Sequence, residues 1–141
     1  MKDHWSTQFV GKQFADHGRG PETYDCWGLV RAAMQAATGV TMPSFADDYV
    51  CSAERSELDA LIAGERGTFE PIDEGKEKPL DLALFRIRGW RSHIGIVTSP
   101  GRMLHVGNEE QQSCIESYRT GRWAPKLEGF YRYAMETKDV G

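Results

Sequence analysis

The sequence has 141 residues, of which 40% are hydrophobic and 27% are charged, and its formal net charge is −4. This composition predicts a single globular domain over residues 1–141, large enough to bury a core, and the charge gives no electrostatic reason to bind nucleic acid or anionic lipid. No apolar run is long enough for membrane insertion and the N-terminus lacks the apolar core of a secretory signal, so we expect synthesis in the cytoplasm.

The first part of the chain predicts a short helix followed by a loop. Trp5 and Phe9 lie one helical turn apart, which favours a short helix within residues 5–14. Residues 15–23 are rich in glycine, proline and aspartate and indicate a loop. Because this loop precedes the next helix directly, it could form one wall of a cleft, with His17 as a candidate lining residue.

The next segment predicts a helix over residues 26–38 with a cysteine in its first turn. Apolar residues recur there with the i, i+3, i+4, i+7 spacing of one buried stripe, while Asp25 is a good N-cap and Gly39 a good terminator. Unpaired N–H groups and the helix dipole at such a position favour an anion, which makes a thiol a better nucleophile. Cys26 is therefore a candidate catalytic nucleophile.

The second half of the chain changes to the period of strands. After a polar-faced helical segment within residues 47–63, turn residues separate six runs with strand character. We predict strands at residues 69–72, 81–88, 93–98, 102–106, 113–118 and 129–134. This order predicts an α+β domain, in which N-terminal helices pack on a C-terminal antiparallel sheet of about five or six strands.

Two of these strands carry histidines. Alternation puts His93, Gly95 and Val97 on one face of their strand, and the turn at Pro100 leads into a strand carrying His105 that should pair antiparallel with it. A cysteine followed by a histidine and then by a second polar residue is the order that a thiol peptidase needs, with His93 as the base and His105 orienting it. Gly95 would leave room for the cysteine helix to lie close to the sheet.

Alone, each of these residues has a structural explanation, and it is their combination that points to chemistry. The three cysteines show no CxxC pair and no zinc-ligand spacing, so neither a metal site nor a disulfide framework is indicated. Cys51 and Cys114 are interpreted as small apolar fillers. A phosphate-loop interpretation of Gly18 and Gly20 is rejected, because their spacing is wrong and no lysine follows.

Three short runs, Asp25 to Val30, His93 to Val97 and Leu104 to Val106, resemble the motifs of the NlpC-type cell-wall peptidases, which are papain-like cysteine peptidases. The resemblance extends over nearly the whole chain. It is closest to the branch carried by tailed phages and gene transfer particles, in which a tryptophan after the cysteine is familiar. Residues 14–19 and 127–132 also resemble that branch.

The resemblance implies a cysteine endopeptidase or amidase that hydrolyses peptide bonds in peptidoglycan stem peptides without a metal or organic cofactor. Cys26 would attack the carbonyl, His93 would act as base and acid, and His105 would orient His93. The partners would be phage-like tail or baseplate proteins, so that the protein would be associated with the virion or tail and act at the cell wall.

The chain departs from the usual family pattern at two places. Trp27 stands where serine is common, and Phe14 stands where a tyrosine hydroxyl usually helps to bind the oxyanion. Tyr24, Asp25, Trp27 and His17 are the candidates for substrate or oxyanion binding, and Tyr24 or His17 could replace the missing hydroxyl. These departures leave open the alternative of a catalytically weak or inactive tail-tip subunit with the same fold. Separately, the residues alone leave open acyl transfer through the same thioester chemistry.

Overall fold

The computed structural model of the chain describes residues 4–15, 18, 20–42, 69–87, 91–106 and 112–133, and every structural statement below concerns these residues. The helical elements are η1 (Thr7–Phe9), α1 (Cys26–Thr38) and η3 (Gly121–Lys126). The strands are β1 (Gln13–Phe14), β2 (Thr23–Tyr24), β3 (Phe69–Ile72), β4 (Leu82–Ile87), β5 (Arg91–Ser99), β6 (Arg102–His105), β7 (Cys114–Ser117) and β8 (Leu127–Tyr133). None of the described helices is both long enough and apolar enough to span a membrane.

Helix α1 begins and ends where the sequence predicts. The Asp25 side chain accepts a hydrogen bond of 2.7 Å from the Gly28 backbone N–H, which satisfies one of the unpaired donors of the first turn. At the other end, Gly39 takes a left-handed conformation with φ 82° and donates its N–H to the Gln35 carbonyl. Both capping predictions are confirmed, and together they place Cys26 at the first position of the helix.

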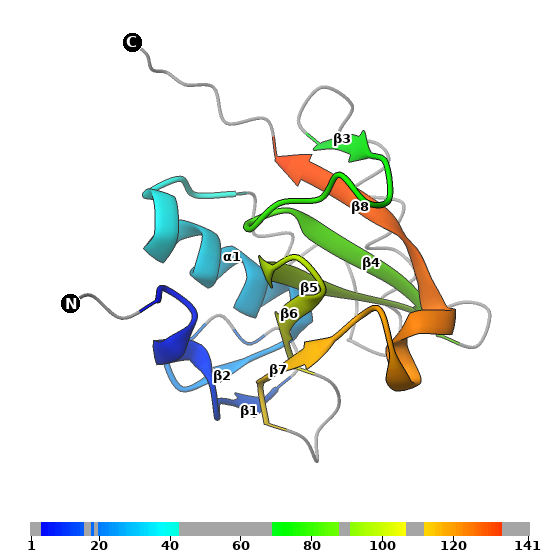
Figure 1. Cartoon of the computed structure of the whole chain (residues 1–141). Coiled ribbons are helices and arrows are strands. Elements are labelled where there is room, and N and C mark those ends of the chain that lie inside the picture. Colours follow the sequence, from blue (N-terminus) through cyan, green and yellow to red (C-terminus); the bar gives the residue numbers. More distant parts are fainter. Residues whose placement is uncertain are drawn as a thin grey trace, which may run out of the picture.

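The six strands β3 to β8 form one antiparallel sheet in the order β3-β8-β4-β5-β6-β7. The predicted pairing of β5 with β6 is confirmed, with Ile96 opposite Leu104 and Val97 opposite Met103. The chain returns from β7 through η3 to β8, which lies between β3 and β4, so the last strand is paired along both of its edges (Figure 1). This is the α+β arrangement that the sequence predicts.

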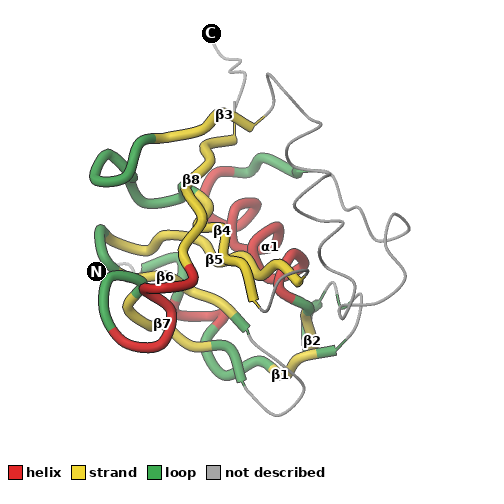
Figure 2. Tube along the Cα trace, turned by 90° about the vertical axis from the view of Figure 1, so that its right-hand side faces the viewer, coloured by secondary structure: helices red, strands yellow, loops and turns green. Residues whose placement is uncertain are grey.

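The sheet separates two clusters of buried side chains. Ile94, Ile96 and Leu104 belong to the cluster that contains the buried residues of α1. Figure 2 shows α1 beside β4 and β5. The intervening residues Val97 and Met103 point to the other face, where they pack with aromatic residues of β4, β8 and η3 and with Tyr118, which follows β7. Alternation along β5 and β6 therefore places Ile94, Ile96 and Leu104 toward the cysteine helix and Val97 and Met103 toward η3.

Gly95 makes room for a neighbouring strand rather than for α1. A Cβ atom at this position would lie 2.7 Å from the Met103 sulfur, 3.2 Å from the Leu104 carbonyl oxygen and 3.3 Å from the His105 Cβ. All three atoms belong to β6. The expectation that Gly95 lets the cysteine helix approach is thus wrong, because the space beside this residue is occupied by Met103, Leu104 and His105 of β6.

Three local features differ from the sequence prediction. Residues 5–14 form the single turn η1 and the short strand β1, because glycine at position 11, with φ 89°, stops any longer helix. The loop before α1 contains β2, which pairs in parallel with β1. Before β8, η3 forms where we expected only a turn. The helix predicted within residues 47–63 lies outside the described residues.

Candidate active site

Cys26 stands at the N-terminus of α1, which packs directly on β5 and β6, the two strands that carry the predicted histidines. Its side chain is completely buried, with 0% of its surface exposed. The first-turn N–H groups around it favour a negative charge on sulfur or on an attached oxygen. The structure thus brings the cysteine helix against the histidine strands, whereas the contact between the sulfur and His93 stays a prediction.

The two histidines are hydrogen-bonded to each other. His93 Nε2 lies 2.9 Å from His105 Nδ1, and the two rings are nearly perpendicular, at 85°. His93 is 0% exposed and His105 is 1% exposed. A second polar residue on the neighbouring strand therefore holds the His93 ring, which is the orienting arrangement that a cysteine–histidine pair requires.

Glu116, on β7, completes a chain of hydrogen bonds that the sequence analysis missed. Its Oε1 atom lies 2.8 Å from His105 Nε2 and also accepts a 3.1 Å hydrogen bond from Trp123 Nε1, while Arg122 Nε donates to its Oε2 over 3.1 Å. In the β6–β7 register Glu116 is opposite Met103, which makes it diagonal to His105 and places it on the same face.

Trp123 forms a wall of this cluster. Its ring stacks on His93 at 4.6 Å between centroids and 18° between planes, and it meets the His105 ring edge-on at 5.2 Å. Because the tryptophan is itself buried, it keeps water away from the histidine pair and strengthens the hydrogen bonds there. No sequence pattern distinguishes Trp123 from an aromatic residue of the core or the surface.

The remaining candidate residues either pack in the core or lie at the start of α1. Trp27 is completely buried and meets Phe69 edge-on at 6.0 Å, so packing accounts for it, and Asp25 is accounted for as the N-cap. Tyr24 is opposite Phe14 in the β1–β2 pair, next to the position where the family usually has a tyrosine. Burial raises the pKa of its phenol, which keeps the hydroxyl protonated and able to donate. His17 lies outside the described residues.

Within the described part of the chain, one group of three side chains could hold a metal ion. The ligand atoms of His105, Cys114 and Glu116 lie within 4.8 Å of one another. However, the carboxylate already pairs with Arg122 and accepts from His105 and Trp123, and the Cys114 sulfur lies 3.8 Å from His105 Nε2. We therefore interpret this group as a hydrogen-bonded network.

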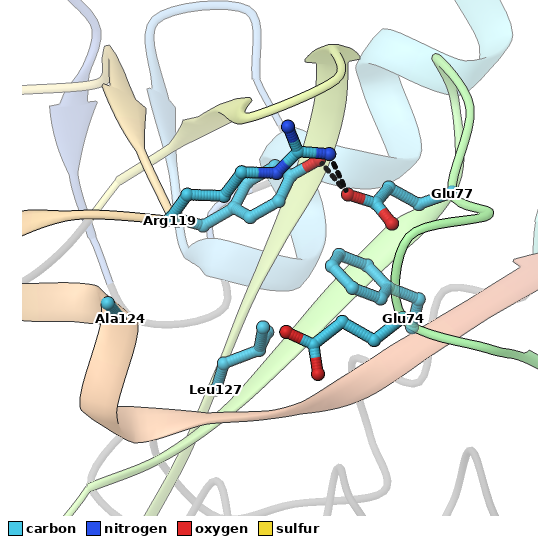
Figure 3. A pocket seen from close by; sticks show the side chains of 7 residues that line it. Glu74, Glu77, Arg119, Ala124 and Leu127 are labelled. Atoms are coloured by element: carbon cyan, nitrogen blue, oxygen red, sulfur yellow. Dashed lines mark hydrogen bonds and ion pairs between the residues drawn. The ribbon is translucent and has the colours of Figure 1, made fainter.

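A separate polar cluster lies on the same side of the sheet as η3. The buried Glu77 carboxylate accepts hydrogen bonds from the Tyr118 hydroxyl at 2.8 Å and from Arg119 at 2.9 Å, beside a cavity of about 110 Å³ that Leu127 also lines (Figure 3). Hydrogen bonds from both partners outweigh burial and lower the pKa of Glu77. Because all these groups are paired, the cluster attaches the loop that precedes β4 to the segment that follows β7.

The charge state of Glu116 predicts how the fold responds to acid. Burial would raise its pKa, but hydrogen bonds from Arg122 and His105 more than offset this and lower the pKa from 4.5 to about 2. A carboxyl whose pKa is lower in the folded state stabilises the fold above its unfolded pKa, and this stabilisation is lost as pH falls through the folded value. We expect the wild type to lose on the order of 1 kcal/mol more than Glu116→Gln between pH 4.5 and pH 2.

Urea unfolding at several pH values across this window measures the difference. Glu128→Gln, which removes another carboxylate paired with an arginine, is the control. Parallel pH profiles for the wild type and Glu116→Gln would show that the Glu116 carboxylate does not contribute to acid stability.

Comparison with known proteins supports the same fold. The sequence pattern described as the NlpC/P60 family matches residues 11–132. The chain is similar to the probable endopeptidases p60 of Listeria innocua and Listeria monocytogenes, each 26% identical over 123 residues. These matches cover 87% of this chain and 22% of each relative, so the chain spans about a fifth of the length of the curated relatives it matches.

Solved structures of low sequence identity share the fold. An NLP/P60-family protein of Staphylococcus aureus, described as similar to lipoprotein, superposes with a TM-score of 0.67 at 18% identity, covering 94% of this chain and 40% of that one. The NlpC/p60 domain of the peptidoglycan hydrolase SagA superposes with a TM-score of 0.59 at 18% identity and covers 93% of both chains. These likenesses confirm the predicted papain-like fold.

Proposed function

The chain belongs to the NlpC/P60 family, and on that premise we propose that it is a cysteine endopeptidase or amidase that hydrolyses peptide bonds in peptidoglycan stem peptides. The observation that carries the proposal is the buried His93–His105 hydrogen bond on the two strands against which the Cys26 helix packs. The descriptions of the relatives as probable endopeptidases and of SagA as a peptidoglycan hydrolase support this substrate class.

In the proposed reaction, His93 accepts the proton of the Cys26 thiol, and the thiolate attacks the carbonyl carbon of the scissile amide. His93 then returns the proton to the departing amine, which leaves a thioester on sulfur. Water, deprotonated by the same imidazole, hydrolyses the thioester and restores the thiol. His105 acts by holding the His93 ring and has no direct contact with the reacting atoms.

The negative oxygen that forms during the attack needs hydrogen-bond donors. We assign this role to the Cys26 backbone N–H at the start of α1 and to the Tyr24 hydroxyl, because Tyr24 is opposite Phe14 and remains protonated. In this assignment Tyr24 replaces the hydroxyl that Phe14 lacks. Because the Cys26 sulfur is completely buried, the proposal also requires that the residues covering it move apart when a peptide binds.

Incubation of the purified protein with isolated stem peptides tests the proposed function. Mass spectrometry should show two fragments whose masses sum to the substrate plus one water. If the peptides stay intact under conditions in which the protein is folded, the hydrolase proposal fails.

We further propose that the protein acts as part of a phage or phage-like tail and opens the cell wall locally. This proposal rests on the tryptophan after the cysteine and on the resemblance of residues 14–19 and 127–132 to the tail-borne branch. Co-sedimentation of the protein with intact tail particles is the expected result, and its absence from purified particles would contradict this placement.

The complete burial of Cys26 and His93 favours a second candidate function. In this alternative the protein is a tail-tip subunit that retains the papain-like fold but does not hydrolyse peptides. Such a subunit would need the cysteine only for packing. The two candidates differ in the stem-peptide assay, since a structural subunit yields no fragments, and in thiol reactivity, since a packing cysteine shows no activation by His93.

A further inference from the structure

The histidine pair is one part of a longer hydrogen-bonded chain that runs across three strands. It begins with His93 on β5, passes through His105 on β6 and ends at Glu116 on β7, with successive distances of 2.9 and 2.8 Å. Each imidazole nitrogen in this chain must either donate or accept. The residue at the end of the chain therefore decides the roles of all the nitrogens before it.

Glu116 can only accept in this arrangement. The Trp123 indole N–H donates to its Oε1 at 3.1 Å, and Arg122 donates to both of its oxygens at 3.1 and 3.2 Å. The guanidinium balances the negative charge, so the carboxylate needs no proton of its own. His105 Nε2, at 2.8 Å from the same oxygen, must consequently carry a hydrogen and donate it.

The role of His105 Nε2 determines the role of its other ring nitrogen. His105 is 1% exposed, and burial lowers its pKa despite the opposing effect of Glu116, so the neutral ring is the relevant form near pH 7. With its hydrogen on Nε2, the neutral ring presents a lone pair at Nδ1. His93 Nε2 must then donate to that lone pair, and the lone pair of a neutral His93 falls on Nδ1.

Trp123 keeps this chain in place. Its ring stacks on His93 and its indole N–H donates to Glu116. One side chain of η3 therefore contacts both ends of the hydrogen-bonded chain. A flip of either imidazole would break a hydrogen bond in a buried site, which carries the full desolvation penalty.

We propose that Glu116 is a positioning residue that sets the tautomers of His105 and His93, so that Nδ1 of His93 is the nitrogen that accepts the thiol proton. The tautomers follow from the hydrogen-bonded chain alone, and their catalytic consequence rests on the proposed function. Glu116 thus acts on the reacting sulfur through two intervening residues, His105 and His93.

Nitrogen-15 NMR of the histidine rings in the full chain tests the proposal directly. At neutral pH, His93 and His105 should both show the neutral tautomer with the hydrogen on Nε2. Substitutions His4→Gln and His17→Gln help to assign the four histidine spectra. A hydrogen on Nδ1 of His93 in the wild type would overturn the proposal, whether or not the protein cleaves peptides.

Variants at position 116 test the cause. Glu116→Ala removes the acceptor, so His105 and His93 should show mixed tautomers and the alkylation of Cys26 should slow by about 10- to 100-fold. Glu116→Gln retains an acceptor oxygen, so its tautomer populations and its Cys26 alkylation rate should lie between those of the wild type and Glu116→Ala. This variant also tests the proposal if Glu116→Ala does not fold. Glu128→Gln should leave the histidine spectrum unchanged, because Glu128 pairs with Arg86 away from the histidines.

Unchanged tautomers in folded Glu116→Ala would show that another group sets them. If the tautomers shift as expected but neither the wild type nor any variant hydrolyses stem peptides, the positioning role stands and only the proposed function fails.

Discussion

Replacing Cys26 with alanine is expected to abolish stem-peptide hydrolysis, with a loss of about 10⁴- to 10⁶-fold in turnover. The reason is that no other atom at the start of α1 can form the covalent bond to the carbonyl carbon. Since a buried cysteine replaced by alanine loses only one small side-chain atom, the variant should remain folded, and circular dichroism with urea unfolding checks this.

Cys51→Ala is the matched control for this experiment, because it removes the same chemical group at another position of the chain. Its hydrolysis rate should equal that of the wild type. Residual turnover of Cys26→Ala close to the wild-type rate would mean that the sulfur is not the nucleophile, and the structural-subunit alternative would then be preferred.

Replacing Trp27 with alanine is expected to lower the free energy of unfolding by about 3–5 kcal/mol. The indole is completely buried and packs edge-on against Phe69, so its removal leaves a large cavity between α1 and the sheet. Such a loss is a large fraction of the total stability of a typical domain. Urea unfolding followed by circular dichroism measures it.

Two further variants show whether Trp27 acts through packing. Trp27→Phe keeps an aromatic ring against Phe69 and should lose much less stability than the alanine variant. Trp5→Ala, at a partly buried tryptophan on the edge of the same cluster, should also lose less. A Trp27→Ala variant that unfolds like the wild type but binds stem peptides weakly would instead assign this residue to substrate recognition.

Much of the fold follows from local patterns in the sequence. The caps Asp25 and Gly39 bound α1 as predicted, because each satisfies backbone groups within one turn of the helix. The six strands of the sheet fall within a few residues of their predicted positions, since alternation and turn residues are both local signals. The hydrogen bond between His93 and His105 follows from a hairpin whose turn, at Pro100 and Gly101, was also visible.

The parts that were missed depend on contacts between distant segments. Glu116 and Trp123 join the histidines only because β7 pairs with β6 and η3 returns beneath the sheet, and neither placement has a local signal. The role of Gly95 was misassigned for the same reason. Alternation shows which residues share a face with Gly95, but it does not show that side chains of β6, and not α1, fill the space beside it.

The most direct test of the account measures the alkylation rate of each cysteine by peptide mapping of the native protein as a function of pH. The account predicts that Cys26 reacts faster than Cys51 and Cys114 near neutral pH, and that His93→Ala removes this advantage. Burial raises the pKa of the Cys114 thiol, which makes it a slow internal reference. Equal rates at Cys26 and Cys114, unaffected by His93→Ala, would contradict the claim that the fold pairs the Cys26 sulfur with a base.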